Sequence, residues 1–222
     1  MKTLSRVRPS KKTRDLVLER LRSAILCGKL LPGTCLVERD LAEEMKVSRT
    51  PVREALGILV EEMLVERLPV RGLIVAQTSR EEIMQLYTMR AELEGLAVRW
   101  FCQHINRRHV AYLENLLKRM EKCVQEQEIR ELVGYDNELH EAIIRFSKSQ
   151  LLIRQLGSIR NKILQYRTRS IQLPGRLEKS IQEHKTLVDY IVSGDALTAE
   201  AYMKSHIYGV LEAVLHMETS YF

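Results

Sequence analysis

The sequence predicts a mostly α protein made of two parts. The first part reads as a winged helix-turn-helix, with three helices and a β-hairpin wing, and the second as an all-α antiparallel bundle of six helices. Two observations predict this: β-type residues gather in one short hairpin near residue 70, and apolar residues recur at helical spacing nearly everywhere else. We therefore expect the winged helix-turn-helix domain at residues 1–78 and the helical domain at residues 79–222.

Local start and stop signals define the first three helices. Apolar positions repeat over residues 10–27 and end at Gly28, a helix-stop signal. The segment "LLPGTCL" then reads as a loop, and "VERDLAEEMK" as a second short helix. The third helix, "VSRTPVREALGILVEEML", has Ser48 as its expected N-cap and Pro51 in its first turn, where a missing N–H costs nothing.

The hairpin and the helical bundle follow from turn residues. Two β-type runs flank Pro69-Val70-Arg71-Gly72, which predicts the wing. No strand is evident after residue 79, and breaks such as "INRR", "LPG" and "SGD" separate helical segments with short connections, which favours an antiparallel bundle. The expected spans are residues 80–103, 106–127, 130–147, 149–171, 175–193 and 195–218.

Charge and composition narrow the classes of partner. Residues 1–78 hold 15 Lys and Arg against 10 Asp and Glu, whereas residues 79–222 hold 20 against 19, so the positive excess lies where a polyanion would bind. The sequence has neither an apolar run of the roughly 18 residues that a membrane span needs nor a secretory signal, so we expect a cytoplasmic protein with no membrane partner. The four cysteines include no C-x-x-C pair, which argues against a zinc ribbon or a dithiol redox motif.

The third expected helix has the pattern of a recognition helix. Val52, Leu56, Leu59 and Val60 form an inward stripe, while Arg49, Thr50 and Arg53 lie on the other side near the N-terminus. Such a helix buries its apolar face and offers donors to base edges and phosphates in the major groove. A solvated helix face explains two arginines equally well, so this helix alone leaves both interpretations open.

The segment "LPGTCLVERDLAEEMKVSRTPVREALGILVEEMLVERLPVRGLIV" resembles the DNA-binding domain of the GntR family of bacterial transcription regulators. The matching elements are the Pro-Gly turn, the "ERDLA" helix, the "VSRTPVREAL" recognition helix and the "RG" wing tip. One departure is Met63, which stands where the family usually has glycine and is expected to lengthen the helix end. The resemblance implies that DNA is contacted by Arg39, Ser48, Arg49, Thr50, Arg53, Arg71 and Gly72.

Within that set, we expect Arg49 and Arg53 to read bases, because a guanidinium can bind guanine through two hydrogen bonds. Ser48 and Thr50 are expected to hold phosphates, which fixes register without reading sequence.

Asp136, His140, His184 and His206 form the candidate metal site. Helical periodicity places each of them inside the apolar stripe of its helix, so three helices aim ligand groups into one core. A single buried histidine is usually an ordinary core residue, but four such groups need partners, and a divalent cation would satisfy all of them. Three imidazoles and a carboxylate suit zinc, nickel, cobalt, iron or manganese, with zinc or nickel preferred and a position left for a ligand.

The spacing of these four residues, together with "EHKTLVDYIVSGDALTAEAYMKSHI", resembles the metal-binding form of the FadR C-terminal (FCD) domain, which defines a branch of the GntR family. Six helices resemble the VanR type of that branch, and Ser149 stands where asparagine is common. The resemblance implies a homodimer on a two-fold symmetric operator, controlled by a small organic acid.

Arg90 is the candidate effector-binding residue. It shares the apolar face of its helix, and Glu94 follows one turn later. Either the two residues form a buried pair that locks the bundle, or Arg90 holds a ligand carboxylate, which its planar fork matches. The family resemblance favours the second interpretation.

The sequence thus predicts a DNA-binding transcription regulator and no enzyme. One alternative is a metalloenzyme, because "HEAII" at residues 140–144 resembles the start of the zinc protease motif H-E-x-x-H, but Ile144 replaces the second histidine. Another is a regulator whose metal is purely structural. His104, His109 and His216 lie near breaks or the C-terminus, and no role is expected for them.

Overall fold

The computed structural model describes residues 11–26, 28–170, 173 and 175–216, leaving out the side chains of residues 11, 12 and 167–169. It divides into two compact units, Met1–Gln77 and Thr78–Phe222, each with its own hydrophobic core. The outermost residues of three expected helices, at positions 10, 27, 171, 217 and 218, lie outside the described residues.

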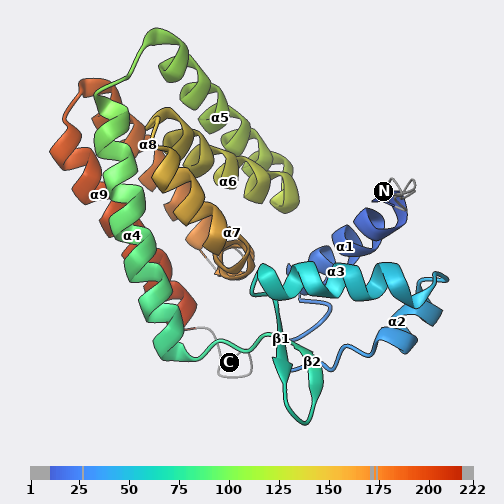
Figure 1. Cartoon of the computed structure of the whole chain (residues 1–222). Helices are drawn as coiled ribbons and strands as arrows, with labels where there is room; N and C mark the ends of the chain where they lie inside the picture. Colours follow the sequence, from blue (N-terminus) through green and yellow to red (C-terminus); the bar gives the residue numbers. More distant parts are fainter. Residues whose placement is uncertain (1–10, 27, 171–172, 174, 217–222) are drawn as a thin grey trace, which may run out of the picture. The chain divides into compact units, whose positions relative to one another are not determined.

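The first unit is a winged helix-turn-helix (Figure 1). Its strands pair antiparallel, with Leu68 opposite Gly72, so residues 69–71 form the exposed tip of the predicted hairpin. Gly72 has a φ of 73°, a left-handed conformation that glycine adopts without strain. The elements are α1 (Lys11–Leu26), α2 (Glu38–Glu44), α3 (Arg49–Glu61), β1 (Val65–Leu68) and β2 (Gly72–Val75).

The start of α3 differs from the prediction in one respect. Ser48 occupies the N-cap position, but its side chain makes no capping hydrogen bond. Pro51 explains this in part, because it occupies the third helical position and has no N–H to donate to the cap. The hydroxyl of Ser48 therefore stays exposed at the N-terminus of the helix, where backbone N–H groups favour anions.

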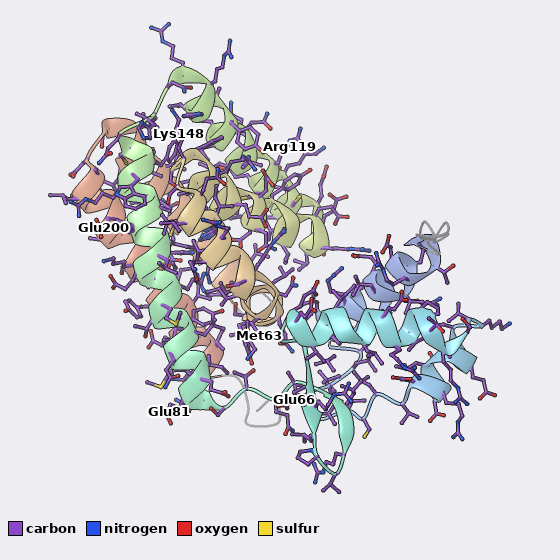
Figure 2. The ribbon with its side chains drawn as sticks, viewed as in Figure 1. Met63, Glu66, Glu81, Arg119, Lys148 and Glu200 are labelled. Atoms are coloured by element: carbon purple, nitrogen blue, oxygen red, sulfur yellow. The ribbon has the colours of Figure 1, made fainter. Side chains whose placement is uncertain are left out.

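The end of α3 corrects a second expectation. Met63 does not lengthen the helix: α3 ends at Glu61, and Met63 adopts a left-handed φ of 57° just beyond it (Figure 2). The N–H of Leu64 donates to the carbonyl of Leu59, and that of Met63 to Val60, both at 3.0 Å, which is the double bond of a Schellman motif. Methionine thus takes the glycine position of this turn with the glycine geometry.

The second unit contains the six predicted helices, and each begins and ends within a few residues of its expected span. In Figure 1, α4 and α9 run side by side, and α4 makes its most extensive packing with α9. No helix among the described residues combines the length and apolarity needed to cross a bilayer. The helices are α4 (Arg80–Cys102), α5 (Arg107–Glu126), α6 (Ile129–Phe146), α7 (Gln150–Ser170), α8 (Arg176–Ser193) and α9 (Ala196–Leu215).

Gly95 allows α4 and α9 to approach closely. A Cβ at this position would lie 2.8 Å from Cε of Lys204 and 3.3 Å from Cγ of Glu200, so any side chain would displace them. Lys204 uses its position over Gly95 to pair with Glu92 of α4 at 2.7 Å. This contact helps to hold α9, and with it His206, against the core.

Candidate functional site

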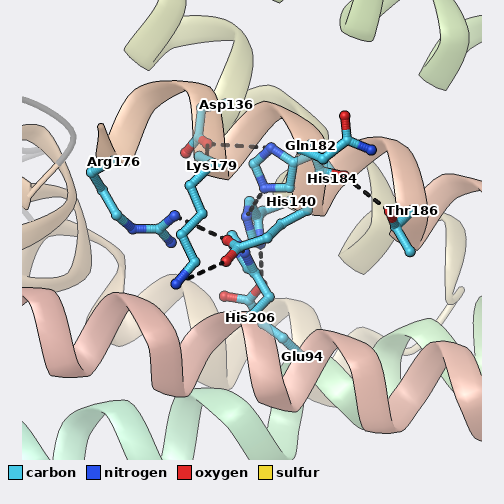
Figure 3. A network of polar contacts seen from close by, with 11 residues as sticks. Glu94, Asp136, His140, Arg176, Lys179, Gln182, His184, Thr186 and His206 are labelled. Carbon is cyan, nitrogen blue, oxygen red and sulfur yellow. Dashed lines mark hydrogen bonds and ion pairs between the residues drawn. The ribbon is translucent and has the colours of Figure 1, made fainter. Parts of the chain in front are cut away.

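Three histidines from three helices meet in the core of the second unit. His140 comes from α6, His184 from α8 and His206 from α9, and all three are at most 4% exposed. Each offers a nitrogen, and these nitrogens lie within 4.8 Å of one another. The structure therefore brings together three of the four predicted metal ligands (Figure 3).

Each imidazole faces a carboxylate on its Nδ1 side. Nδ1 of His140 lies 2.5 Å from Oε2 of Glu94, and Nδ1 of His206 lies 2.7 Å from Oε2 of Glu183. A carboxylate accepts a hydrogen bond from Nδ1–H, which leaves the lone pair on Nε2 free to bind a metal. This arrangement is typical of metal-binding histidines.

The contact between His140 and His184 has a length that suits either a hydrogen bond or two ligands of one ion. Their Nε2 atoms face each other at 3.1 Å. Two tetrahedral zinc ligands with bonds of 2.0–2.1 Å would be about 3.3 Å apart, so the spacing fits a shared ion. If both rings donate from Nδ1, two lone pairs face each other, and a cation between them removes that repulsion.

Burial keeps two of the rings neutral. It lowers the pKa of His184 and of His206 well below 6.5, and the neighbouring histidines lower both further. Burial alone would raise the pKa of Glu94, but the charges of Arg90 and His140 hold that pKa below its ordinary value. Near neutral pH His184 and His206 therefore offer neutral imidazoles, which is the protonation state that a metal requires of them.

Asp136, the fourth predicted ligand, is 3% exposed and lies beside the trio. Its Oδ1 is 3.6 Å from Nδ1 of His184, which is too long for a hydrogen bond, so this nitrogen has no hydrogen-bond partner among the described residues. The hydroxyl of Ser180 also approaches Oδ1, at 3.4 Å. Burial raises the pKa of Asp136. Its role as a metal ligand stays a prediction.

Arg90 forms the buried pair with Glu94, and its role in effector binding stays a prediction. Its Nε donates to Oε1 of Glu94 at 2.7 Å, so the buried pair exists. Its two terminal nitrogens and the hydroxyl of Tyr87 are buried and make no hydrogen bond of ordinary geometry among the described residues, although the charge of Arg90 lies close enough to offset part of the rise that burial causes in the pKa of Tyr87. Burial raises the pKa of Tyr87 to about 12, so this hydroxyl stays protonated. Unpaired buried donors of this kind need a ligand or water.

Sequence reasoning missed two acids and an arginine. Glu94 was assigned only to Arg90, although it also contacts His140. Glu183 lies next to His184 in the sequence yet serves His206, and Arg176, 7% exposed, donates to Glu183 at 3.0 Å. The one available signal was the dipeptide Glu183-His184, and it does not reveal a partner on another helix.

The predicted DNA contacts gather on the surface of the first unit. The structure exposes Arg39, Ser48, Arg49, Thr50, Arg53, Arg71 and Gly72. Val52, Leu56 and Leu59 are fully buried, so the inward stripe of α3 agrees with its predicted phase. Val60, expected in the same stripe, is partly buried against this core.

Arg53 has a partner that the sequence did not indicate. Its Nε and one terminal nitrogen contact the carboxylate of Glu38, on α2, at 2.9 to 3.1 Å. This pair is exposed, so it orients the Arg53 side chain without adding much stability. Among the residues that the structure describes, Arg49 has no comparable ion pair.

Comparison with known families decides the identity of the two units. The model described as "Bacterial regulatory proteins, gntR family" matches residues 13–75, and the FCD domain matches residues 85–209. The chain belongs to the GntR family, FCD branch. This GntR regulator is therefore a DNA-binding transcription regulator with an effector-binding type of C-terminal domain.

Relatives and solved structures agree. The GntR regulator is 31% identical over 132 residues to the Nta operon transcriptional regulator of Aminobacter aminovorans, covering 60% of this chain and 62% of that one. It is 26% identical to McbR of Escherichia coli, covering 79% and 80%. Both are named as transcriptional regulators, in line with the prediction of a regulator and not an enzyme.

A GntR regulator of Rhodococcus sp. RHA1 has the same fold, with a TM-score of 0.75, 23% identity and coverage of 93% of this chain and 99% of that one. The structure of McbR aligns with a TM-score of 0.70 at 20% identity, covering 90% and 93%.

Proposed function

We propose that this GntR regulator binds its operator as a homodimer and that a small carboxylic acid, bound beside a divalent metal ion, controls its affinity for DNA. The observation that carries the proposal is the buried histidine trio, in which His140 and His206 each contact a carboxylate and which lies near the guanidinium of Arg90. His140, His184 and His206 would hold the ion, with Asp136 as the fourth ligand.

When bound, the ion supplies a Lewis-acidic position for one carboxylate oxygen of the effector. The chain supplies the rest. Arg90 offers two terminal N–H groups to the effector while its Nε stays on Glu94, and Tyr87 offers a protonated hydroxyl from the same helix. Glu94 and Glu183 orient the rings of His140 and His206. If the effector binds one arrangement of the bundle more tightly than another, its binding shifts the population toward that arrangement.

Thermal-shift screening of carboxylic acids tests the effector assignment. We expect acids to raise the melting temperature of the metal-loaded protein and to have little effect after chelation. Arg90→Lys keeps a positive charge beside Glu94 but loses the planar fork, so it should weaken this response while the protein still retains metal. Equal responses with and without metal would place the acid elsewhere and leave the metal a structural role.

On DNA, Arg49 and Arg53 are proposed to read bases from α3. Their replacement by alanine should weaken operator binding by about 1–3 kcal/mol each and relax the sequence preference. Arg107→Ala, at an exposed position of α5, removes the same charge from the other unit and serves as the control. Operator titrations of the three variants at one salt concentration decide the assignment, and unchanged binding by both α3 variants contradicts it.

A further inference from the structure

A groove between α6 and α7 adjoins the histidine centre. It has a volume of about 360 Å³, which lies within the range of small-molecule sites. Its floor is formed by Ile144, Ile153 and Leu156, with Gly157 and the side chains of Arg145, Arg160 and Glu141 around them. Nothing in the chemistry of the metal centre requires this second space.

A smaller cavity lies between the groove and the histidine centre, because it shares lining residues with the groove and also touches His140. This cavity, of about 40 Å³, is lined by Glu94 and His140 at one end. It shares four of its lining residues with the groove: Glu141, Ile144, Leu156 and Arg160. A molecule whose head lies beside His140 can therefore extend its body past Ile144 and Leu156 toward the surface.

The charges at the groove are already paired. Arg160 contacts Glu141 at 2.5 Å, and Arg145 contacts Glu138 at 3.1 Å. An arginine without an acidic partner would favour a second acidic group on the ligand. Because both arginines are paired, the aliphatic side chains are the surface that remains for the ligand to contact. The groove therefore fits an uncharged apolar body.

We propose that the effector is a monocarboxylic acid with an apolar body, whose carboxylate lies at the histidine centre and whose body lies in the groove between α6 and α7. This inference rests on the proposed function for the position of the carboxylate and adds the class of acid. A short acid places its carboxylate at the histidine centre and leaves the groove empty. A longer acid also contacts Ile144, Ile153 and Leu156.

Calorimetric titration of the metal-loaded protein with butanoate, hexanoate and octanoate tests the proposal. Each methylene buried in the groove should tighten binding by about fourfold. Gly157→Leu fills the groove from α7, where an added Cβ meets nothing within 4 Å, so the fold tolerates it. This variant should bind butanoate like the parent and lose the gain shown by octanoate.

Gly134→Leu is the matched control, because Gly134 is an exposed glycine of α6 with equally open space around its Cβ and lies outside both cavities. It should bind all three acids like the parent.

Equal affinity for the three acids, or an octanoate gain that survives Gly157→Leu, overturns the groove assignment alone. No binding of any acid overturns the carboxylate effector of the proposed function as well. A change in oligomeric state on Gly157→Leu, seen by light scattering, would make the groove an interface between copies and also overturn the inference.

Discussion

At the residue scale, Glu94 joins Arg90 to the histidine trio. Glu94 shares its two oxygens between Arg90 and His140, and all three side chains are at most 3% exposed. Glu94 thus links Arg90, one turn earlier in α4, to His140 of α6, a candidate metal ligand. Removing either end of such a chain leaves a buried charge without its partner.

Arg90→Met should therefore destabilise the protein by about 3–5 kcal/mol. The double variant Arg90→Met/Glu94→Gln should recover part of this loss, because it also removes the charge that was left unpaired. Urea unfolding of the two single variants, the double variant and the parent measures the coupling. Additive losses would mean that the pair does not act as a unit.

At Met63, in contrast to Arg90, we expect a substitution to stabilise the protein. A left-handed conformation costs a residue with a side chain about 1–2 kcal/mol, and Met63 is 37% exposed, so its replacement loses little buried surface. Met63→Gly should stabilise the protein by about 1 kcal/mol and raise its melting temperature. A lower melting temperature would show that the Met63 side chain contributes more than its backbone costs.

At the element scale, the sequence predicted the helices well because their limits are set locally. Gly28, Asn106 and Gly194 lie at ends that short-range signals define, and the observed helices agree with the predicted spans to within a few residues. Helical phase likewise predicted which faces of α6, α8 and α9 are buried.

The contacts between helices were not predictable in the same way. Glu183 and His184 are adjacent in α8, but packing of α9 against α8 decides that Glu183 reaches His206. The groove beside α7 depends on side chains from two helices, which periodicity does not position relative to each other. Met63 was misjudged because a Schellman turn favours glycine but also accepts another residue at a cost.

The packing of α6, α8 and α9 also predicts a response to acid. The pKa values of His184 and His206 lie below 6.5 in the folded protein, so between those values and 6.5 the unfolded chain binds more protons. Stability of the metal-free protein should therefore fall as the pH drops below 6.5, by up to about 1.4 kcal/mol per pH unit for each histidine. Asp136, with a raised pKa, acts in the opposite direction at lower pH.

Urea unfolding of chelated protein at several pH values between 5 and 7 measures this slope. His184→Phe should reduce it, whereas His104→Ala, at an exposed position of the same unit, should leave it unchanged. A parent slope of zero across this interval would contradict neutral, buried rings.

At the scale of the whole molecule, the proposed regulation requires that effector and operator binding be coupled. Coupling is reciprocal: if hexanoate changes operator affinity by a factor of about 5 to 150, operator DNA must change hexanoate affinity by the same factor. Titrations of the metal-loaded protein with each ligand, in the presence and absence of the other, measure both factors. Unequal factors would show that the acid acts by another route, such as removing the metal.

The central claim is that His140, His184 and His206 bind a divalent ion, and the metal content of the purified protein tests it most directly. After zinc or nickel loading and desalting, the parent and His104→Ala should retain one ion per chain by elemental analysis, whereas His184→Ala should retain almost none while keeping its helical circular dichroism. Absence of metal from the parent, or equal retention by folded His184→Ala, would contradict the claim.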